Sequence, residues 1–566
     1  MCGLWSRGHG RLGRGGGPGG DSPAVGALCA AGSAVPAHRG CQCHWVARRM
    51  FCRILPGHQA GWRRPDVCGQ SCERRIAGVY RDAGSLGGGR VRGDQRRVRA
   101  RCGRRAGRCG SGACRTPGWE AGPRPGKGLP LMILAIDLGS TSFKAALFDG
   151  RLRQVWSRAA PLRYRYGSDG RVELAAAGVE AAMRGVLPRR RDIAAIAVTS
   201  QAQTFAAVDR AGRAQRPFVS WQDGRAGNAC AALRLLLPDF GLHSSFAELL
   251  PALQICQLRR RPPERGATVL LLPSYFVRRW TGESVTDENL AAMSGLYSLK
   301  LGAWWPAAMR ACGLRECQLP RVVPIGAVAA FTARNDYGLP AGVPVVLAGN
   351  DQTAGAYGAR LDRNGATLIT LGTAQVVYRC VSRRPAAARD VIRGPFPGGR
   401  FYRMATDAFG GNVVNWARTV LAGCESGDAF FARARQSPAG CRGVAFDPER
   451  REWRGLGWHV ASGEMARSVL ESLSARLAGM RSRVCPAGPG TLLVAGGGAR
   501  PEWRAIVSAR LGGRLRPTSA NPLVGAARMA MCKTRRRTRK AKQDEYPTDA
   551  ARPRAGETAA SSSRTT

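Results

Sequence analysis

One stretch decides the fold of this chain: Leu131-Met-Ile-Leu-Ala-Ile-Asp137-Leu-Gly139-Ser140-Thr141-Ser142-Phe-Lys144-Ala-Ala-Leu-Phe-Asp149. Two short apolar runs flank a Gly-Ser-Thr-Ser turn, which predicts a strand, a tight turn and a second strand. The turn offers backbone N–H groups, three hydroxyls and the Lys144 ammonium group, and these suit a polyanionic phosphate chain. Asp137 ends the first strand, where its carboxylate can hold a hydrated metal ion. The stretch therefore predicts a site for nucleotide phosphates.

The hairpin also divides the chain, because residues 1–131 have a different composition. They carry basic and glycine-rich runs such as Arg14-Gly-Gly-Gly-Pro-Gly-Gly20, together with ten of the nineteen cysteines. No period of a helix or a strand is sustained there. Arg, Gly, Ala, Pro, Cys and Trp together are typical of GC-rich DNA read upstream of a gene. We expect this segment to be disordered or not normally translated, with Met132 as the start.

Two other interpretations of this segment stay open. A zinc module could use Cys41, Cys43, His44, Cys68 and Cys72, although no pair has the usual Cys-x2-Cys spacing. An organelle transit peptide would share the arginines and the shortage of acids, but it would also be amphipathic and rich in serine.

The far end, residues 532–566, is also basic and lacks an apolar pattern. It contains Lys533-Thr-Arg-Arg-Arg-Thr-Arg-Lys540 and closes on Ser, Thr and Ala, so we expect a disordered, solvated tail. The whole chain has a net charge of +49. Basic ends can touch nucleic acid or a membrane surface. Since these ends are the sole support for such binding, we expect no nucleic-acid partner and no membrane partner.

The central part, residues 132–531, is long enough for two or three domains. Its cysteines are scattered without paired spacing, which favours reduced thiols and a cytoplasmic location. No apolar run there reaches the roughly 18 residues of a membrane span. Short apolar runs end in polar loops, where open α/β sheets place their ligands. The expected strands are Ile193–Val198, Phe205–Val208, Pro344–Ala348, Thr367–Leu371 and Thr491–Ala495, and the expected helices are Ala466–Leu477 and Pro522–Met531.

The order of motifs resembles the FGGY family of carbohydrate kinases, within the actin-like ATPase superfamily. The matching segments are Asp137–Lys144, Gln201–Gln203 with Trp221-Gln-Asp223-Gly-Arg225, Trp280–Asp287 with Ala291, Ala348–Gly358, Leu371–Thr373, and Gly496–Arg500 with Trp503 and Gly525. The resemblance covers nearly all of the central part. It implies an α/β fold of two actin-like (ribonuclease H-like) domains around a central cleft, with domains at 132–360 and 361–531.

The resemblance also implies ATP and Mg²⁺ as cofactors, with the metal at Asp137. The ATP-binding residues that it implies are Gly139, Ser140, Thr141, Ser142, Lys144, Gly372, Thr373, Gly411, Gly497 and Gly498. Taken without the family, the Ser140–Ser142 hydroxyls could belong to a plain hairpin turn, and Lys144 could be an exposed strand lysine. Gly497 and Gly498 allow close backbone approach to adenosine, or form a simple turn after a buried strand.

A sugar hydroxyl is a poor nucleophile, and a positioned carboxylate is the simplest general base for it. Asp351 is the candidate, because it lies in a Gly-Asn-Asp-Gln loop at the end of an expected strand. Its alternative role is to cap the helix that follows. A sugar also needs hydrogen-bonding groups and an apolar surface, and the candidates for these are Gln201, Gln203, Trp221, Asp223 and Arg225. Asp223 and Arg225 could instead form a local ion pair.

Two departures from the family pattern bear on the substrate and on the activity. Glycerol kinases carry an Arg-Glu pair where this chain has Gln201-Ala-Gln-Thr204, and xylulose kinases usually have Gln-Met-His there. The stretch from Trp416 to Leu456 is shorter than in the family. We expect an ATP-dependent kinase of a ketopentose such as xylulose, with the sugar and ATP as its partners and a homodimer left open. The alternatives are a kinase of another polyol or ketose, and a catalytically impaired sugar-binding protein with the FGGY fold.

Overall fold

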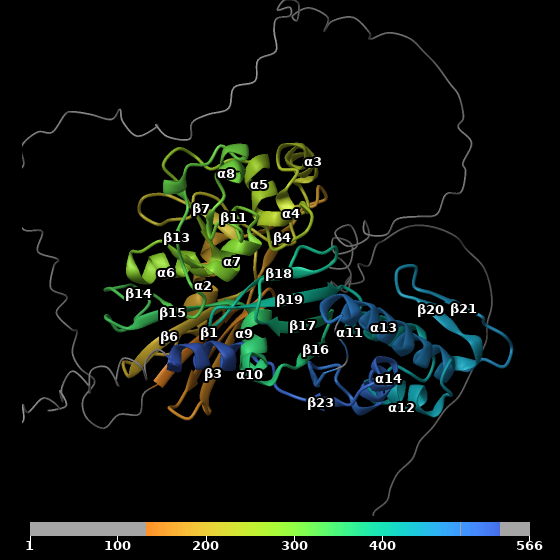
Figure 1. Cartoon of the computed structure of the whole chain (residues 1–566). Coiled ribbons are helices and arrows are strands. Elements are labelled where there is room, and N and C mark those ends of the chain that lie inside the picture. The colour runs from red at the N-terminus through yellow and green to blue at the C-terminus, as the bar shows by residue number, and fades with distance from the viewer. Residues whose placement is uncertain (1–131, 487, 489, 533–566) are drawn as a thin grey trace, which may run out of the picture. The chain divides into compact units, whose positions relative to one another are not determined.

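The computed structural model describes residues 132–486, 488 and 490–532. The expectations for residues 1–131, including the candidate zinc ligands, and for 533–566 lie outside the described residues. The described part is built on two six-stranded sheets and several smaller ones (Figure 1).

The first six-stranded sheet has the order β14-β15-β6-β1-β2-β3. Its strands are β1 (Met132–Leu138), β2 (Ser142–Phe148), β3 (Gln154–Pro161), β6 (Ile193–Ser200), β14 (Val328–Phe331) and β15 (Pro344–Asn350). β1 and β2 pair antiparallel with Asp137 opposite Lys144, so the predicted hairpin is confirmed. β6 lies parallel to both β1 and β15. Every residue of β1 is buried, as expected for a strand with both faces of its sheet covered.

Helices cover both faces of this sheet. On one face, α2 (Ala176–Val186) and α6 (Leu272–Thr281) share an apolar core with β1, β2 and β6. On the other face, a helix over 522–532 packs Ala526 and Ala527 against Ile133 and Ala135. The helix predicted at Pro522–Met531 is therefore present, and it completes the core of the first sheet from the far end of the chain.

A smaller five-stranded sheet has the order β4-β5-β8-β7-β9. Its strands are β4 (Tyr164–Tyr166), β5 (Val172–Leu174), β7 (Phe205–Val208), β8 (Phe218–Val219) and β9 (Thr268–Leu271). Around it lie α3 (Gly227–Leu236), α4 (Phe240–His243), α5 (Gln254–Arg260), α7 (Glu288–Met293) and α8 (Pro306–Ala311), with the two-stranded pairs β10 (Val285–Asp287) and β13 (Arg321–Val323), and β11 (Tyr297–Ser298) and β12 (Ala303–Trp304). Of these elements, α3, α4, α5, α7, α8, β7, β9, β11 and β12 contribute buried residues to a second apolar core. The segments expected to bind a sugar, 201–203 and 221–225, adjoin β7 and β8.

The second six-stranded sheet has the order β18-β19-β17-β16-β22-β23. Five of its strands repeat the plan of the first sheet, and the sixth, β18, lies at the edge opposite to that of β14. Its strands are β16 (Thr367–Leu371), β17 (Gln375–Val381), β18 (Ile392–Phe396), β19 (Arg400–Asp407), β22 (Leu492–Ala495) and β23 (Leu515–Pro517). β16, β17, β19 and β18 are joined antiparallel, whereas β16, β22 and β23 run parallel. One apolar core joins the sheet to α11 (Gly411–Val420), α12 (Gly427–Gln436), α13 (Ser462–Val484) and α14 (Pro501–Leu511).

The helix predicted at Ala466–Leu477 lies inside α13. The short stretch between Trp416 and Leu456 includes a hairpin of β20 (Ala445–Asp447) and β21 (Glu452–Arg454). The carboxylate of Asp447 accepts the N–H groups of Glu449 and Arg450, so residues 447–450 form the turn of that hairpin.

α9 (Asp351–Gly358) begins where β15 ends and is followed by α10 (Leu361–Asn364). Ala356 of α9 belongs to the apolar core on the face of the second sheet that carries Tyr378 and Tyr402. Tyr357 packs against this core and against the core of the first sheet. α9 therefore contacts both halves of the described structure, each of which is built on one of the six-stranded sheets. A shift of either half would move the helix that starts at Asp351.

Among the described residues, none of the helices combines the length and apolar character that a membrane crossing needs. The nine described cysteines are free thiols, which agrees with the reduced cysteines expected from the sequence.

Candidate active site

Three strand ends meet at one edge of the first sheet. The parallel register sets Asp137 of β1 opposite Thr199 of β6, and Ser200 of β6 opposite Asn350 of β15. Asp137 and Asp351 therefore lie at the carboxyl ends of parallel strands, where α/β sheets place their ligands. Gln201, directly after β6, donates its backbone N–H to the Leu138 carbonyl at 3.0 Å. The side chain of Gln201 reaches the Gly139 carbonyl, with Nε2 and O at 3.4 Å.

The pKa values of the Asp137 and Asp351 carboxylates are both raised, and the charge of Asp351 contributes to the shift at Asp137. Burial, reinforced by the negative charge of Asp351 and opposed by Lys144, raises the pKa of Asp137 from 3.8 to about 7. Burial also raises the pKa of Asp351 above its ordinary range, against the hydrogen bonds from Gln352 and the charge of Lys144 that lower it. Two poorly solvated carboxylates thus lie close to the charge of the exposed Lys144. Perturbed carboxylates of this kind gather at sites that handle protons or cations.

The first turn of α9 leaves the Asp351 carboxylate available. The N-cap is Asn350, whose Oδ1 accepts the N–H of Thr353 at 2.7 Å. The Asp351 carboxylate accepts the backbone N–H of the neighbouring Gln352 at 2.8 Å and also interacts with the Gln352 side chain. The capping role that the sequence left open for Asp351 therefore belongs to Asn350.

The turn between β1 and β2 is tight and open to solvent. A Cβ on Gly139 would lie 2.9 Å from the Ser142 carbonyl oxygen, so the turn leaves no room for a side chain there. Thr141 and Lys144 are exposed, whereas Ser140 and Ser142 are partly buried. Hydroxyls and backbone N–H groups next to a cation form the kind of concave site that binds phosphate oxygens.

A second loop lies between β16 and β17, and two glycine-rich segments pack directly against it. Gly411, the first residue of α11, donates its N–H to the Gly372 carbonyl at 2.7 Å. Gly498 donates to the Leu371 carbonyl at 2.8 Å. The expected second phosphate loop, the start of α11 and the expected adenosine segment are thus neighbours. Gly497 has no atom within 4 Å of an added Cβ and faces open space.

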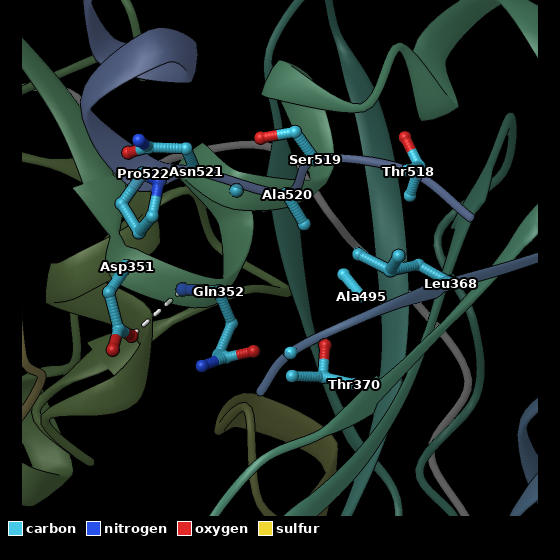
Figure 2. A pocket seen from close by; sticks show the side chains of 12 residues that line it. Asp351, Gln352, Leu368, Thr370, Ala495, Thr518, Ser519, Ala520, Asn521 and Pro522 are labelled. Atoms are coloured by element: carbon cyan, nitrogen blue, oxygen red, sulfur yellow. Dashed lines mark hydrogen bonds between the residues drawn. The ribbon is translucent and has the colours of Figure 1, made fainter. Parts of the chain in front are cut away.

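A cavity of about 470 Å³ joins the catalytic candidate to the second sheet. Figure 2 shows Asp351 and Gln352 of α9 on one side of it, and Thr370 of β16 on another. The rest of the lining consists of Gly355, Leu368, Ala495, Gly496 and the segment 518–522. Gln352, Thr370 and Asn521 add polar groups that the sequence did not single out. Since they come from distant parts of the chain, no local motif could have grouped them.

Gln203 is committed to the backbone of the surrounding helices. Its Nε2 donates to the Met293 carbonyl at the end of α7, and its Oε1 accepts the N–H of Gln254 at the start of α5, at 3.1 Å. Its own backbone has a φ of +70°, in the left-handed region that a non-glycine residue rarely adopts. Gln203 thus fixes the loop after β6 to α5 and α7.

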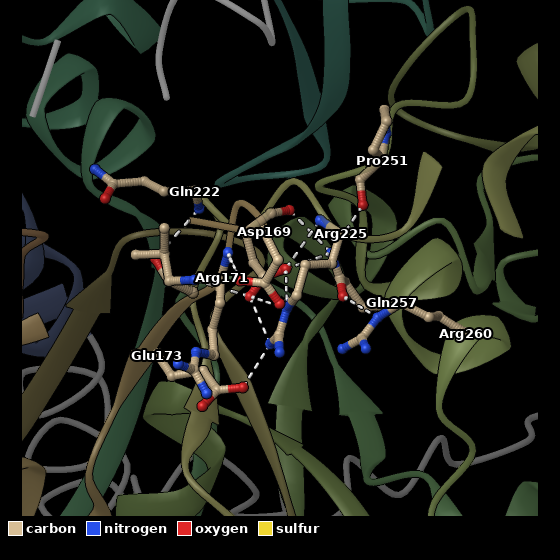
Figure 3. Close-up of polar contacts among 11 residues, drawn as sticks. Asp169, Arg171, Glu173, Gln222, Arg225, Pro251, Gln257 and Arg260 are labelled. Atoms are coloured by element: carbon tan, nitrogen blue, oxygen red, sulfur yellow. Dashed lines mark hydrogen bonds and ion pairs between the residues drawn. The ribbon is translucent and has the colours of Figure 1, made fainter. Parts of the chain in front are cut away.

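Asp223 and Arg225 form the local ion pair that the sequence left open. Arg225 Nη2 lies 2.7 Å from Asp223 Oδ2 and also contacts Glu173. Asp223 is fully buried and further accepts the Val172 N–H at 3.0 Å and the Gln257 side-chain amide at 3.3 Å. Figure 3 shows Arg225 directed at Glu173. In this arrangement the Asp223 oxygens are occupied by protein donors.

Trp221 lies beside the same loop, because its N–H donates to the Thr204 hydroxyl at 3.2 Å. Its indole Nε1 is buried and has no partner among the described residues. Asp137 Oδ1 is likewise buried and unpartnered within the described part. Gln201 Oε1 is also buried and unpartnered there. Buried polar atoms are normally paired, so these atoms of three site candidates indicate where a ligand would bind.

Replacement of Asp137 by Asn is expected to stabilise the protein without ATP, and more at pH 8 than at pH 5. The pKa of Asp137 rises from 3.8 to about 7 on folding. The free energy of unfolding of the wild-type protein therefore falls as the pH rises through this window. Asn carries no charge at either pH. Thermal melts at pH 5 and pH 8 measure the difference in Tm.

Asp149→Asn is the control, and its change in Tm should have the opposite sign. Hydrogen bonds from Arg153 lower the pKa of Asp149, so the charge of Asp149 stabilises the fold and its removal should lower Tm. A gain in Tm for Asp137→Asn that is equal at both pH values would contradict this account of Asp137.

Known proteins of similar sequence include sugar kinases and glycerol kinases. Residues 132–358 match the model of the FGGY family of carbohydrate kinases, N-terminal domain. Xylulose kinase of Escherichia coli K12 is 27% identical over 446 residues, which cover 70% of this chain and 89% of the relative. Glycerol kinase of Methylobacterium nodulans is 28% identical over 423 residues, which cover 66% and 83%.

The crystal structure of xylulose kinase from Rhodospirillum rubrum has a TM-score of 0.64 at 22% identity, and the match covers 71% of this chain and 90% of that one. The similarity spans both halves of the described structure. The expected fold class, α/β with two actin-like domains, is confirmed.

Proposed function

This chain belongs to the FGGY family of carbohydrate kinases and is a sugar kinase, and from that premise we propose its reaction. It transfers the γ-phosphoryl group of ATP to a hydroxyl of a ketopentose such as xylulose, and Asp351 accepts the hydroxyl proton. The observation that carries this proposal is the Asp351 carboxylate, which faces a cavity between elements of both halves and is not needed as the helix cap.

The raised pKa of Asp351 suits the role of a general base. A base works best when its pKa lies near the working pH, and burial moves this carboxylate in that direction. The reaction removes one proton from the sugar hydroxyl as its oxygen bonds to phosphorus and the bond to ADP breaks. Because the transition state is loose, positioning and charge neutralisation supply most of the catalysis. Domain closure over the sugar would exclude water from the site.

The phosphates of ATP would lie between the two loops. On the first sheet these are the Gly139–Ser142 turn and Lys144, and on the second sheet Gly372 and Thr373. Gly411 supports the second loop directly, and Gly497 and Gly498 would approach the adenosine.

Asp137 fits an Mg²⁺ site, because Mg²⁺ in kinases uses one or two carboxylates together with substrate phosphates. The buried, unpartnered Oδ1 of Asp137 and its proximity to Asp351 meet that need. No cluster of three or more His, Cys, Asp or Glu side chains occurs in the described ranges, and such a site does not require one. When bound, the metal would neutralise phosphate charge.

The sugar would bind near Gln201, Gln203, Trp221, Asp223 and Arg225. Of these, Gln201 lies closest to the first phosphate loop, and the unpartnered Trp221 Nε1 can donate to a hydroxyl. Gln203 and the Asp223–Arg225 pair would hold the wall of this pocket, and Asp223 would meet a sugar only by exchanging one of its present partners.

Xylulose is favoured because the similarity to a xylulose kinase extends over 89% of that relative, whereas Gln201-Ala-Gln-Thr204 lacks the Arg-Glu pair of glycerol kinases. Another polyol or ketose is the alternative within the kinases. A catalytically impaired sugar-binding protein is the alternative outside them, motivated by the short stretch between Trp416 and Leu456. We further propose a cytoplasmic location, consistent with the free thiols, and a homodimer as the assembly to test.

ADP release by the full chain with Mg-ATP and a panel of ketoses and polyols tests the proposal. We expect turnover that depends on the sugar and is fastest with a ketopentose. Fast turnover with a different sugar would keep the kinase reaction and replace the ketopentose by that sugar as the substrate. Heat of sugar binding in calorimetry without any ADP release would support the impaired sugar-binding protein and overturn the kinase reaction.

A further inference from the structure

Asn289 holds the residues on either side of Asp351. This asparagine lies on α7 and is fully buried. Its Oδ1 accepts the backbone N–H of Asn350 at 3.0 Å, and its Nδ2 donates to the Thr353 hydroxyl at 3.2 Å. One side-chain amide therefore fixes the residue before Asp351 and the residue two positions after it.

The same amide extends to the second sheet. Asn289 Nδ2 also donates to the Pro395 carbonyl of β18, at 2.8 Å. The Thr353 hydroxyl lies 2.9 Å from the Tyr378 hydroxyl of β17. The first turn of α9 is thus tied to both halves of the protein through Asn289 and Thr353.

Asn289 is itself held in place. The Asp287 carboxylate caps α7 and accepts the N–H groups of Asn289 and Leu290, at 2.9 and 3.0 Å. A Cβ on Gly349 would lie 2.9 Å from Asn289 Oδ1, so glycine at 349 leaves room for the amide. The position demands one acceptor and two donors at once. A primary amide supplies these, whereas an acid, a hydroxyl or an apolar side chain of similar size does not.

We propose that Asn289 is a positioning residue for the phosphoryl transfer, which aligns the Asp351 carboxylate with the sugar hydroxyl and links that alignment to the placement of the second sheet. This inference rests on the proposed role of Asp351 as the base. A displacement of about 1 Å in a reacting group can lower a rate about 10²-fold. Two of the three bonds of the Asn289 amide act on the loop and helix turn that carry Asp351, so their loss allows such a displacement.

Asn289→Ala in the full chain tests the proposal. We expect kcat for sugar phosphorylation to fall about 10- to 100-fold. The KM for sugar and for Mg-ATP should change less than about threefold, because Asn289 belongs to neither the proposed sugar-binding nor the proposed ATP-binding residues. We also expect the ratio of inorganic phosphate to sugar phosphate to rise, because a misplaced base favours transfer to water. A role in folding alone would not change that ratio.

Thr353→Val and Tyr378→Phe test the same network with smaller changes, since each removes a hydroxyl and keeps the shape. We expect Thr353→Val to reproduce a milder form of the Asn289→Ala effect, with a drop in kcat and a raised phosphate ratio. These variants keep the proposal testable if Asn289→Ala does not fold.

Asn335→Ala is the matched control. The Asn335 amide also joins backbone groups, donating to Ala333 and Leu339 and accepting from Tyr337 and Leu339. It lies before β15, at the opposite end of that strand from Asp351. We expect a loss of Tm with kcat and the phosphate ratio unchanged.

The inference is overturned if folded Asn289→Ala keeps kcat within about threefold of the wild type, or if Asn335→Ala lowers kcat and raises the phosphate ratio equally. Wild-type turnover separates the two proposals. If the wild type lacks sugar-dependent turnover, the base assignment fails and this inference falls with it. If the wild type turns over and Asn289→Ala matches it, only this inference fails.

Discussion

Replacing Asp351 by Asn is expected to lower kcat for sugar phosphorylation by about 10²–10⁴-fold, the range for loss of a general base. Asn keeps the shape and the hydrogen bond from Gln352 but cannot take the proton. The KM for the sugar and for Mg-ATP should change little, because the lost interaction develops in the transition state. The measurement is steady-state ADP release at pH 8 with saturating substrates.

We expect Asp351→Asn to stay folded, and its Tm tests this. Burial raises the pKa of Asp351, so its charge opposes folding above that pKa, and removing the charge should maintain or raise Tm at pH 8. Asp362→Asn is the control, because Asp362 lies on α10 just beyond α9 and pairs only with Arg363 among its described ion-pair partners. A folded Asp351→Asn variant that keeps more than about a tenth of wild-type kcat would exclude Asp351 as the base.

Replacing Gly496 by Ala is expected to have the second largest effect, a loss of both stability and ATP binding. Gly496 has a φ of +102°, and an added Cβ would lie 2.3 Å from the Leu371 carbonyl oxygen. The strain of the backbone alone is about 1–3 kcal/mol. The clash would also push away Leu371 and the adjoining loop that we propose to bind phosphate. We expect a clearly lower Tm and a KM for ATP raised more than about tenfold.

Two other glycines separate backbone strain from the loss of ATP binding. Gly512→Ala has a φ of +64° and no atom within 4 Å of the new Cβ, so it should show backbone strain without a change in KM for ATP. Gly497→Ala has open space around its Cβ, so it should fold like the wild type and still raise the KM for ATP if adenosine binds there. Wild-type ATP kinetics in both Gly496→Ala and Gly497→Ala would remove this segment from the nucleotide site.

Local patterns predicted the elements that carry the two proposed phosphate loops. The apolar runs on either side of Gly139–Ser142 form β1 and β2, and Thr367–Leu371 is β16 with the same bounds. These elements are short and bounded by turn residues, so the pattern of the chain is sufficient to place them. The parallel register then brings Asp137 and Asp351 to one sheet edge, as expected for strand ends in an α/β sheet.

Contacts between distant parts of the chain were not predictable in the same way. Nothing near Asn289 indicates that its amide bonds to residues 350, 353 and 395. The sequence left Asp223 either free for a sugar or paired with Arg225, because the choice depends on Glu173 and Gln257, which the fold supplies. The helix over 522–532 was expected, but its place on the first sheet depends on packing, not on its own pattern.

Phosphorus NMR of the full chain with Mg-ATP and xylulose tests the central claim most directly. The account predicts a new phosphate monoester that forms in equal amount with ADP and is absent without the sugar. Folded protein that yields no monoester with xylulose or with any ketose or polyol of the panel, or that releases only inorganic phosphate from ATP, would contradict it.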